Sequence, residues 1–204
     1  MSPGRALPST KPFVLASASP RRLELLKALG LRVTVDPSGI DETLNPGTSP
    51  EQEALRLAQA KAKEVRERWP RSAVLAADTL VVLDDRVLMK PADRNHAVQM
   101  LQALRGREHR VITGVSTGEA NSYVETKVHM RPYSDAEIEL YVATGDPMDK
   151  AGAYAIQHSG FRPVDRIDGC YCNVVGLPLG LVRDLLDLNV QRPAQCEGCP
   201  DWKS

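Results

Sequence analysis

The spacing of apolar residues along this chain switches repeatedly between the two-residue period of a strand and the period of about 3.6 residues of a helix. Over the first third, the expected elements are a strand at 13–16, a helix at 20–30, a strand at 31–36, a loop rich in Pro, Gly, Ser and Thr at 37–50, and a long helix at 50–68. Proline and glycine stand at most of these boundaries, where they start turns and end helices. The pattern predicts an α/β protein.

Strands are more frequent in the middle of the chain. The expected elements there are a buried strand at 73–78, a separate apolar run at 79–83, a turn at Asp84 and Asp85, a strand at 86–90, a helix at 92–104, paired strands at 109–117 and 122–130, and a short helix at 135–142. AYAIQ at 153–157, a crossover rich in Gly and Pro, CNVVG at 172–176 and a last helix at 178–188 complete the series. We therefore expect a curved mixed β-sheet flanked by helices.

The length of 204 residues suits one large domain or two small lobes, because domains usually contain roughly 100 to 200 residues. We expect this domain at 12–189, with an N-terminal extension at 1–11 and a C-terminal tail at 190–204. The longest apolar stretch, 174–182, is far shorter than the ~20 residues of a membrane-spanning helix, and the apolar run after position 12 is too short for a secretion signal. We expect a cytoplasmic protein with reduced cysteines and no membrane partner.

The charge of the chain limits the kinds of partner that it can bind. Its 26 Lys and Arg residues balance 26 Asp and Glu residues, which argues against a nucleic-acid partner, because such binding surfaces need a basic excess. Residues 1–22 nevertheless contain Arg5, Lys11, Arg21 and Arg22 and no acidic side chain. Overall neutrality is therefore compatible with a compact anion site that uses a few cations.

Residues 17–22, with the sequence SASPRR, combine a strong helix start with an unusual charge. Ser19 suits the N-cap and Pro20 the first helical position. Arg21 and Arg22 then place positive charge in a first turn whose free N–H groups favour acidic side chains. Hydroxyls, guanidinium groups and backbone N–H groups that meet at one helix N-terminus suit a phosphate chain. The alternative is that both arginines point into solvent.

Four further residues have the chemistry to complete a phosphate site. Asp78 ends an apolar strand, where α/β sheets bind ligands and a carboxylate suits Mg²⁺, although Asp-Thr is also typical of a turn. Glu42, in the loop after the second strand, would supply a second carboxylate for a hard cation beside a triphosphate. Lys61 and Lys90 would add positive charge, and the alternative for both is a solvated surface lysine.

The segments SASPRR, GIDE, LAQAKA, AADT, LMKP, DKAGAYAIQ and NVVGLPL occur in an order and at a spacing that resemble those of the Maf family of nucleoside triphosphate pyrophosphatases, over 14–186. The resemblance implies an inosine-triphosphatase-like α/β fold with a cleft between two lobes, usually in a homodimer. It also implies cleavage of a nucleoside triphosphate to the monophosphate and pyrophosphate with Mg²⁺ or Mn²⁺, in nucleotide pool cleansing or the control of cell division.

Matched residue by residue, the resemblance implies a role for each candidate. The substrate-binding positions are Ser17, Arg21, Arg22, Lys61 and Gln157, with Lys90 also placed near the phosphates. Asp78 matches the proton acceptor, and Glu42 and Lys90 match further catalytic residues, with Glu42 and Asp78 holding the metal. Arg21, Thr79 and Gln157 match the positions associated with pyrimidine choice, and the last two favour the branch that acts on dTTP and UTP. His158 stands where the family usually has glycine.

A serine hydrolase is one alternative. Residues 114–118 match G-x-S-x-G, and Asp146 and His158 follow in the order that such enzymes use. The motif requires a helix directly after the serine, and Ser116 is followed by a strand-like segment. The local context therefore argues against this alternative.

A zinc-binding module is a second alternative. Cys170 and Cys172 form C-x-C, and Cys196 and Cys199 form C-x-x-C, which is a common half-site for zinc. The combined spacing matches zinc modules poorly. We therefore expect small buried cysteines at 170 and 172 and an unrelated pair in the tail.

Overall fold

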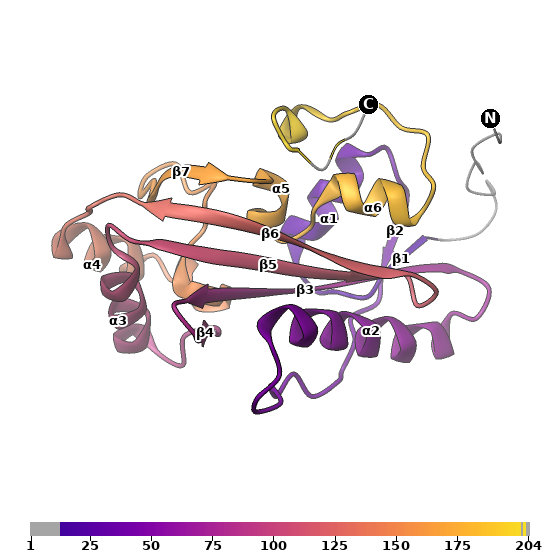
Figure 1. Ribbon diagram of the computed structural model, residues 1–204, viewed down its shortest axis with the longest axis horizontal. Helices are drawn as coiled ribbons and strands as arrows, with labels where there is room; N and C mark the ends of the chain where they lie inside the picture. The colour runs from indigo at the N-terminus through magenta and orange to yellow at the C-terminus, as the bar shows by residue number, and fades with distance from the viewer. Residues whose placement is uncertain (1–12, 201, 203–204) are drawn as a thin grey trace.

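The structure is a computed structural model that describes residues 13–200 and 202 (Figure 1). The expected extension at 1–11, with Arg5 and Lys11, lies outside the described residues. The elements are β1 (Phe13–Leu15), α1 (Pro20–Ala28), β2 (Val33–Val35), α2 (Pro50–Arg68), β3 (Ala73–Leu83), β4 (Arg86–Leu88), α3 (Arg94–Leu104), β5 (Glu108–Ser116), β6 (Asn121–Met130), α4 (Asp135–Ala143), η1 (Asp146–Asp149), η2 (Ala151–Ala153), β7 (Val164–Asp168), α5 (Tyr171–Val175), α6 (Leu179–Leu185) and η3 (Ala194–Cys196). The α/β class is confirmed. In this part of the chain, no helix has the length and apolar character needed to cross a membrane.

The strands form one mixed sheet in the order β2-β1-β3-β5-β6-β7, with β4 paired to β3. The expectation that Asp78 ends a strand is wrong, because β3 continues to Leu83. The parallel partner β1 stops at Leu15, opposite Leu75, and the antiparallel partner β4 begins to pair only at Val81. Within the described chain, this edge of β3 therefore has no strand partner around Asp78, and a ligand can approach the sheet there.

Helices cover both faces of the sheet (Figure 1). α2 packs on one face, where its Ala62 and Val65 meet Val74 of β3. α1, α5 and α6 share an apolar cluster on the other face, and α3 and α4 pack at the far end of the long strands. Since successive side chains of a strand point to opposite faces, Asp78 lies on the α2 face and Thr79 on the α1 and α5 face.

α2 lies so close to β5 that only glycine fits at Gly114. A Cβ built there would lie 2.8 Å from the backbone nitrogen of Leu55 and closer still to the carbonyl of Ala54. Gly114→Ala must push the helix off the sheet, so we expect the free energy of unfolding to fall by about 3 kcal/mol. Tm should fall by about 6–12 °C in thermal denaturation followed by circular dichroism. Gly39→Ala is the control, because a Cβ there meets only Glu64 Oε1, at 4.0 Å. An unchanged Tm in Gly114→Ala would contradict the packing.

Buried His109 in β5 makes the fold sensitive to acid. Its Nε2 lies 2.8 Å from the Tyr154 hydroxyl, and burial, followed by the charge of His129, lowers its pKa from 6.5 to about 3. As the pH falls, His109 is therefore protonated in the unfolded chain before it is protonated in the folded protein. The stabilisation is fully present above pH 6.5 and is lost as the pH falls toward 3. We expect His109 to remove about 1.4 kcal/mol of unfolding free energy per pH unit in this window.

Urea denaturation between about pH 4 and 6 measures this contribution. His109→Gln should show a shallower loss of stability with falling pH than the wild type. Tyr154→Phe keeps the buried imidazole and should retain the wild-type slope. Equal slopes in His109→Gln and wild type would refute the assignment.

Candidate active site

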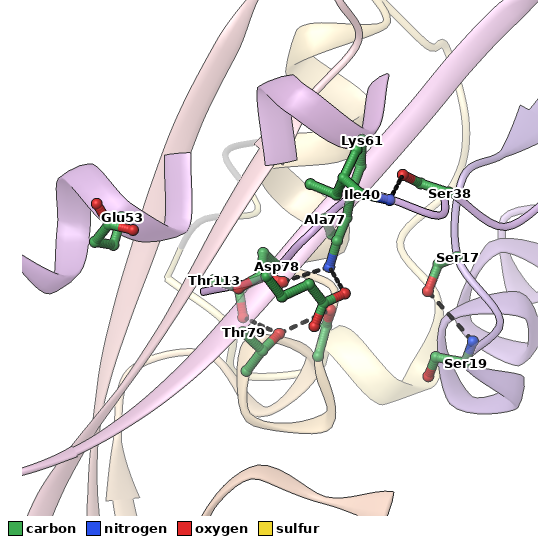
Figure 2. A network of polar contacts seen from close by, with 12 residues as sticks. Ser17, Ser19, Ser38, Ile40, Glu53, Lys61, Ala77, Asp78, Thr79 and Thr113 are labelled. Atoms are coloured by element: carbon green, nitrogen blue, oxygen red, sulfur yellow. Dashed lines mark hydrogen bonds and ion pairs between the residues drawn. The ribbon is translucent and has the colours of Figure 1, made fainter. Parts of the chain in front are cut away.

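The turn between β1 and α1 leads into a helix N-terminus that suits an anion. Ser19 caps the helix, since its Oγ accepts a hydrogen bond from the backbone N–H of Arg22 at 3.5 Å, and Pro20 starts the helix as expected. Ser17 is buried, and its Oγ accepts from the Ser19 N–H at 3.2 Å (Figure 2). The first turn of α1, all of which is described, holds no acidic side chain. Its partial positive charge is therefore available to a ligand.

The guanidinium of Arg22 is hydrogen-bonded to other parts of the chain and does not point into solvent. Its Nε donates to the Gly176 carbonyl at 2.8 Å, and one terminal nitrogen donates to the Ala77 carbonyl at 2.7 Å and Ser17 Oγ at 3.0 Å. The other terminal nitrogen donates to Thr79 Oγ1 at 2.9 Å. The Ala77 carbonyl lies on the open edge of β3, so the guanidinium takes the place of a missing strand. Four of its five N–H groups are used, which leaves one for a ligand. Burial lowers the pKa of Arg22, yet an arginine stays charged.

Arg21 reaches across the cleft to η1, where its terminal nitrogen lies 3.2 Å from Asp149 Oδ2. Lys150 is buried beside this pair, and its Nζ lies 2.7 Å from Asp149 Oδ1 and 2.9 Å from Asp146 Oδ1. Sequence reasoning did not assign a role to Asp149 and Lys150, although both stand in the family-like segment DKAGAYAIQ. Phosphate oxygens in the cleft would compete with Asp149 for both cations.

Lys61 is buried between two carboxylates, so the alternative of a solvated lysine is wrong. Its Nζ lies 2.5 Å from Asp78 Oδ1 (Figure 2). It also lies 2.7 Å from Glu42 Oε1. The side chains of Lys61 and Asp78 are 8% and 9% exposed, whereas that of Glu42 is 43% exposed. A buried ammonium needs paired charge, and these two carboxylates supply it.

The loop that carries Glu42 is fixed by α2. Arginines of this helix donate to the carbonyl of Pro37 at 3.0 Å and to that of Thr43 at 2.8 Å, one on each side of Glu42. Burial by itself would raise the pKa of Glu42, but the hydrogen bond and charge of Lys61 outweigh burial and lower it. Glu42 therefore faces the cleft as a carboxylate at neutral pH.

All of these groups meet in one cleft of about 370 Å³, within the size range of small-molecule sites. The cleft is lined by every residue expected at the site: Ser17, Arg21, Arg22, Glu42, Lys61, Asp78, Thr79, Lys90 and Gln157. Lys90 and Gln157 are exposed to solvent, so Lys90 is a solvated lysine that also faces the cleft.

Two other sequence features lie elsewhere. His158 packs its ring on Tyr141, with 4.7 Å between ring centroids, and its Nδ1 accepts from the Phe161 N–H at 2.9 Å. It therefore shapes the turn after Gln157. Ser116 is buried at the end of β5 and is followed by a turn and β6, so the helix that a serine hydrolase needs is not there.

The carboxylate pair fits a hard divalent cation. Lys61 contacts Oδ1 of Asp78 and Oε1 of Glu42. Among the described residues, no hydrogen bond is made to Asp78 Oδ2 or Glu42 Oε2. Carboxylate oxygens are the ligands that Mg²⁺ and Mn²⁺ prefer, and substrate phosphates usually supply further ones.

The fold and the cleft define an α/β protein whose cleft places the cationic end of α1 opposite a pair of carboxylates. A family model described as Maf-like protein matches residues 12–188, and the chain belongs to the Maf family. Similar proteins include the dTTP/UTP pyrophosphatases of Syntrophomonas wolfei, 47% identical over 84% of this chain and 94% of that protein, and Geobacter metallireducens, 48% identical over 88% and 97%. The dTTP/UTP pyrophosphatase of Thermomicrobium roseum is 47% identical over 92% of this chain and 93% of its own.

Proposed function

We propose that this protein hydrolyses dTTP and UTP to the nucleoside monophosphate and pyrophosphate. The observation that carries the proposal is the buried carboxylate of Asp78, held by Lys61 at 2.5 Å in a cleft whose other side is the cationic end of α1. The names of relatives that are 47–48% identical over most of the chain support the choice of nucleotide.

Hydrolysis at the α phosphorus needs a positioned water, a base, and cations that stabilise charge on the phosphoryl oxygens. Asp78 accepts the proton of the attacking water. Lys61 and Lys90 neutralise charge that develops on the transferred phosphoryl group, and Arg21 stabilises the leaving pyrophosphate. Pyrophosphate is a good leaving group at neutral pH, so no covalent nucleophile is required.

Arg22 acts mainly by positioning. With four hydrogen bonds to the protein, it fixes the Ser17 and Thr79 hydroxyls on either side of the open edge of β3. Its remaining N–H group and the Ser17 hydroxyl contact the phosphates. Exchange for lysine would lose the planar fork that makes these contacts together.

Glu42 and Asp78 would hold Mg²⁺ or Mn²⁺ through the oxygens that Lys61 leaves free. A divalent cation bound there supplies charge neutralisation for the phosphates. Glu42, with the more exposed side chain, remains accessible to it.

Arg21, Thr79 and Gln157 are the proposed specificity residues. Thr79 Oγ1 is held by Arg22 and lies 3.0 Å from Thr113 Oγ1, so it sets the shape of the cleft (Figure 2). The exposed amide of Gln157 is free to read a base through both a donor and an acceptor. A cytoplasmic homodimer that acts in nucleotide pool cleansing or division control stays a prediction from the family resemblance, and light scattering after size exclusion would test the dimer.

A panel of canonical and modified nucleoside triphosphates, with Mg²⁺ or Mn²⁺, tests the proposed function. We expect pyrophosphate release from dTTP and UTP, with purine nucleotides at least about tenfold slower in kcat/KM. Phosphate and pyrophosphate are assayed separately, so that cleavage at the γ phosphate is recognised. Orthophosphate as the product, or no release from any nucleotide, would overturn the proposal.

A further inference from the structure

The four cysteines gather in one buried cluster on the face of the sheet that α1, α5 and α6 cover. Cys170 is the N-cap residue of α5 and Cys172 lies in its first turn, whereas Cys196 ends η3 and Cys199 follows it. All four side chains are at most 2% exposed. The expectation that the tail pair is unrelated to the first pair is wrong, because the C-terminal segment folds back over α5 (Figure 1).

The sulfur atoms are arranged as one group. Cys170 Sγ lies 3.2 Å from Cys199 Sγ, and Cys172 Sγ lies 3.1 Å from Cys196 Sγ. The sulfurs of Cys170, Cys172 and Cys199 all lie within 4.8 Å of one another. A disulfide requires ~2.05 Å between sulfurs, and four sulfurs at ~2.3 Å from a central zinc ion lie roughly 3.8 Å apart. Three of the sulfurs therefore have the span of a tetrahedral site, and Cys196 meets this group through its contact with Cys172.

We propose that Cys170, Cys172, Cys196 and Cys199 form a structural zinc site that fixes the C-terminal segment to the fold. A set of four thiolates selects zinc among the common divalent metals and leaves no open position for a substrate. Each sulfur loses its proton to solvent as its bond to zinc forms, so the bound ion carries a local net charge of about −2. The guanidinium of Arg192, which donates to the Cys199 carbonyl at 2.7 Å, places positive charge beside the site.

The cluster lies in a mostly apolar part of the core. Leu177, Leu179 and Val182 belong to the same buried cluster, which excludes water from it. The Gln195 carbonyl accepts from Cys172 Sγ at 3.3 Å. Four thiols that meet in one buried group match the ligand set of a structural zinc site.

The site is joined to the catalytic cleft through one helix. α5 starts at the cysteine cluster and is followed by Gly176, whose carbonyl accepts from Arg22 Nε at 2.8 Å. The Asn173 carbonyl accepts from Thr113 Oγ1 at 3.2 Å, next to Thr79. Zinc at one end of α5 would thus hold the carbonyl that orients Arg22 at the other end.

Metal analysis of the full chain, purified under reducing conditions and dialysed against a mild chelator, tests the proposal. We expect about one zinc per chain and four thiols that react with a thiol reagent only after the metal is removed. Replacement of the zinc by Co²⁺ should give the intense visible bands of a tetrahedral thiolate site. Zinc-free protein whose four thiols react at once, protein four mass units lighter because two disulfides have formed, or protein that carries iron would each overturn the assignment.

Variants separate a metal site from simple packing. Cys196→Ser with Cys199→Ser should lose the zinc and lower Tm by about 10 °C. Glu197→Gln, an exposed change between the two cysteines, should keep both zinc and Tm. If the double variant fails to fold, metal content and the Co²⁺ spectrum of the wild type still decide. Zinc retained at full stoichiometry in the double variant would refute the proposal.

Discussion

Asp78→Asn is expected to remove nearly all pyrophosphate release and to leave the fold in place. Loss of a general base usually costs 10² to 10⁴ in rate, so we expect kcat on dTTP and UTP to fall by roughly 10³. The fold should persist because the asparagine side-chain oxygen can still accept the hydrogen bond that Lys61 makes to Asp78 at 2.5 Å. Pyrophosphate release, with circular dichroism and Tm measured on the same preparation, checks both parts.

Asp85→Asn is the matched control, because it makes the same chemical change in the exposed turn at the end of β3. It should keep wild-type kcat. A kcat within about threefold of wild type in Asp78→Asn would remove Asp78 from the role of proton acceptor. A variant of Asp78 that loses Tm and activity together would instead assign the residue a structural role.

Local signals in the sequence are sufficient to predict most of the elements. The Ser19 cap followed by Pro20 forms as expected, and α4 starts with a capping box of Ser134 and Glu137, because a cap depends on residues within one helical turn. β3 is longer than the strand that the sequence predicts at 73–78, because the polar Asp78 looks like a strand end. Its continuation depends on pairing with β5, which the local sequence does not show.

The contacts of the site depend on distant parts of the chain and could not be predicted. Arg22 is separated from Ala77 by 55 positions and from Gly176 by 154, so neither contact leaves a local pattern. The same holds for Cys172 and Cys196, which are 24 positions apart and meet only after the tail folds back. Residue types and spacing predicted which side chains line the cleft, and the sheet topology decides which of them touch.

Lys61→Met is expected to be the most destabilising change at the site. Removing one partner of a buried ion pair leaves Asp78 uncompensated, which typically costs about 3–5 kcal/mol of unfolding free energy. Urea denaturation at neutral pH measures this loss. Lys63→Met is the control on α2, because Lys63 is exposed on the same helix, and it should change the free energy of unfolding by less than about 0.5 kcal/mol.

The double variant Lys61→Met with Asp78→Asn tests whether the ion pair of Lys61 and Asp78 serves the fold or the reaction. Because the double variant no longer buries an unpaired charge at Asp78, we expect it to regain most of the stability that Lys61→Met loses, and to stay inactive. Glu42, 43% exposed, keeps its solvation in both variants. Losses of stability that simply add would show that Lys61 and Asp78 are not coupled. Stability that returns without activity would mean that the pair is retained for the reaction and not for the fold.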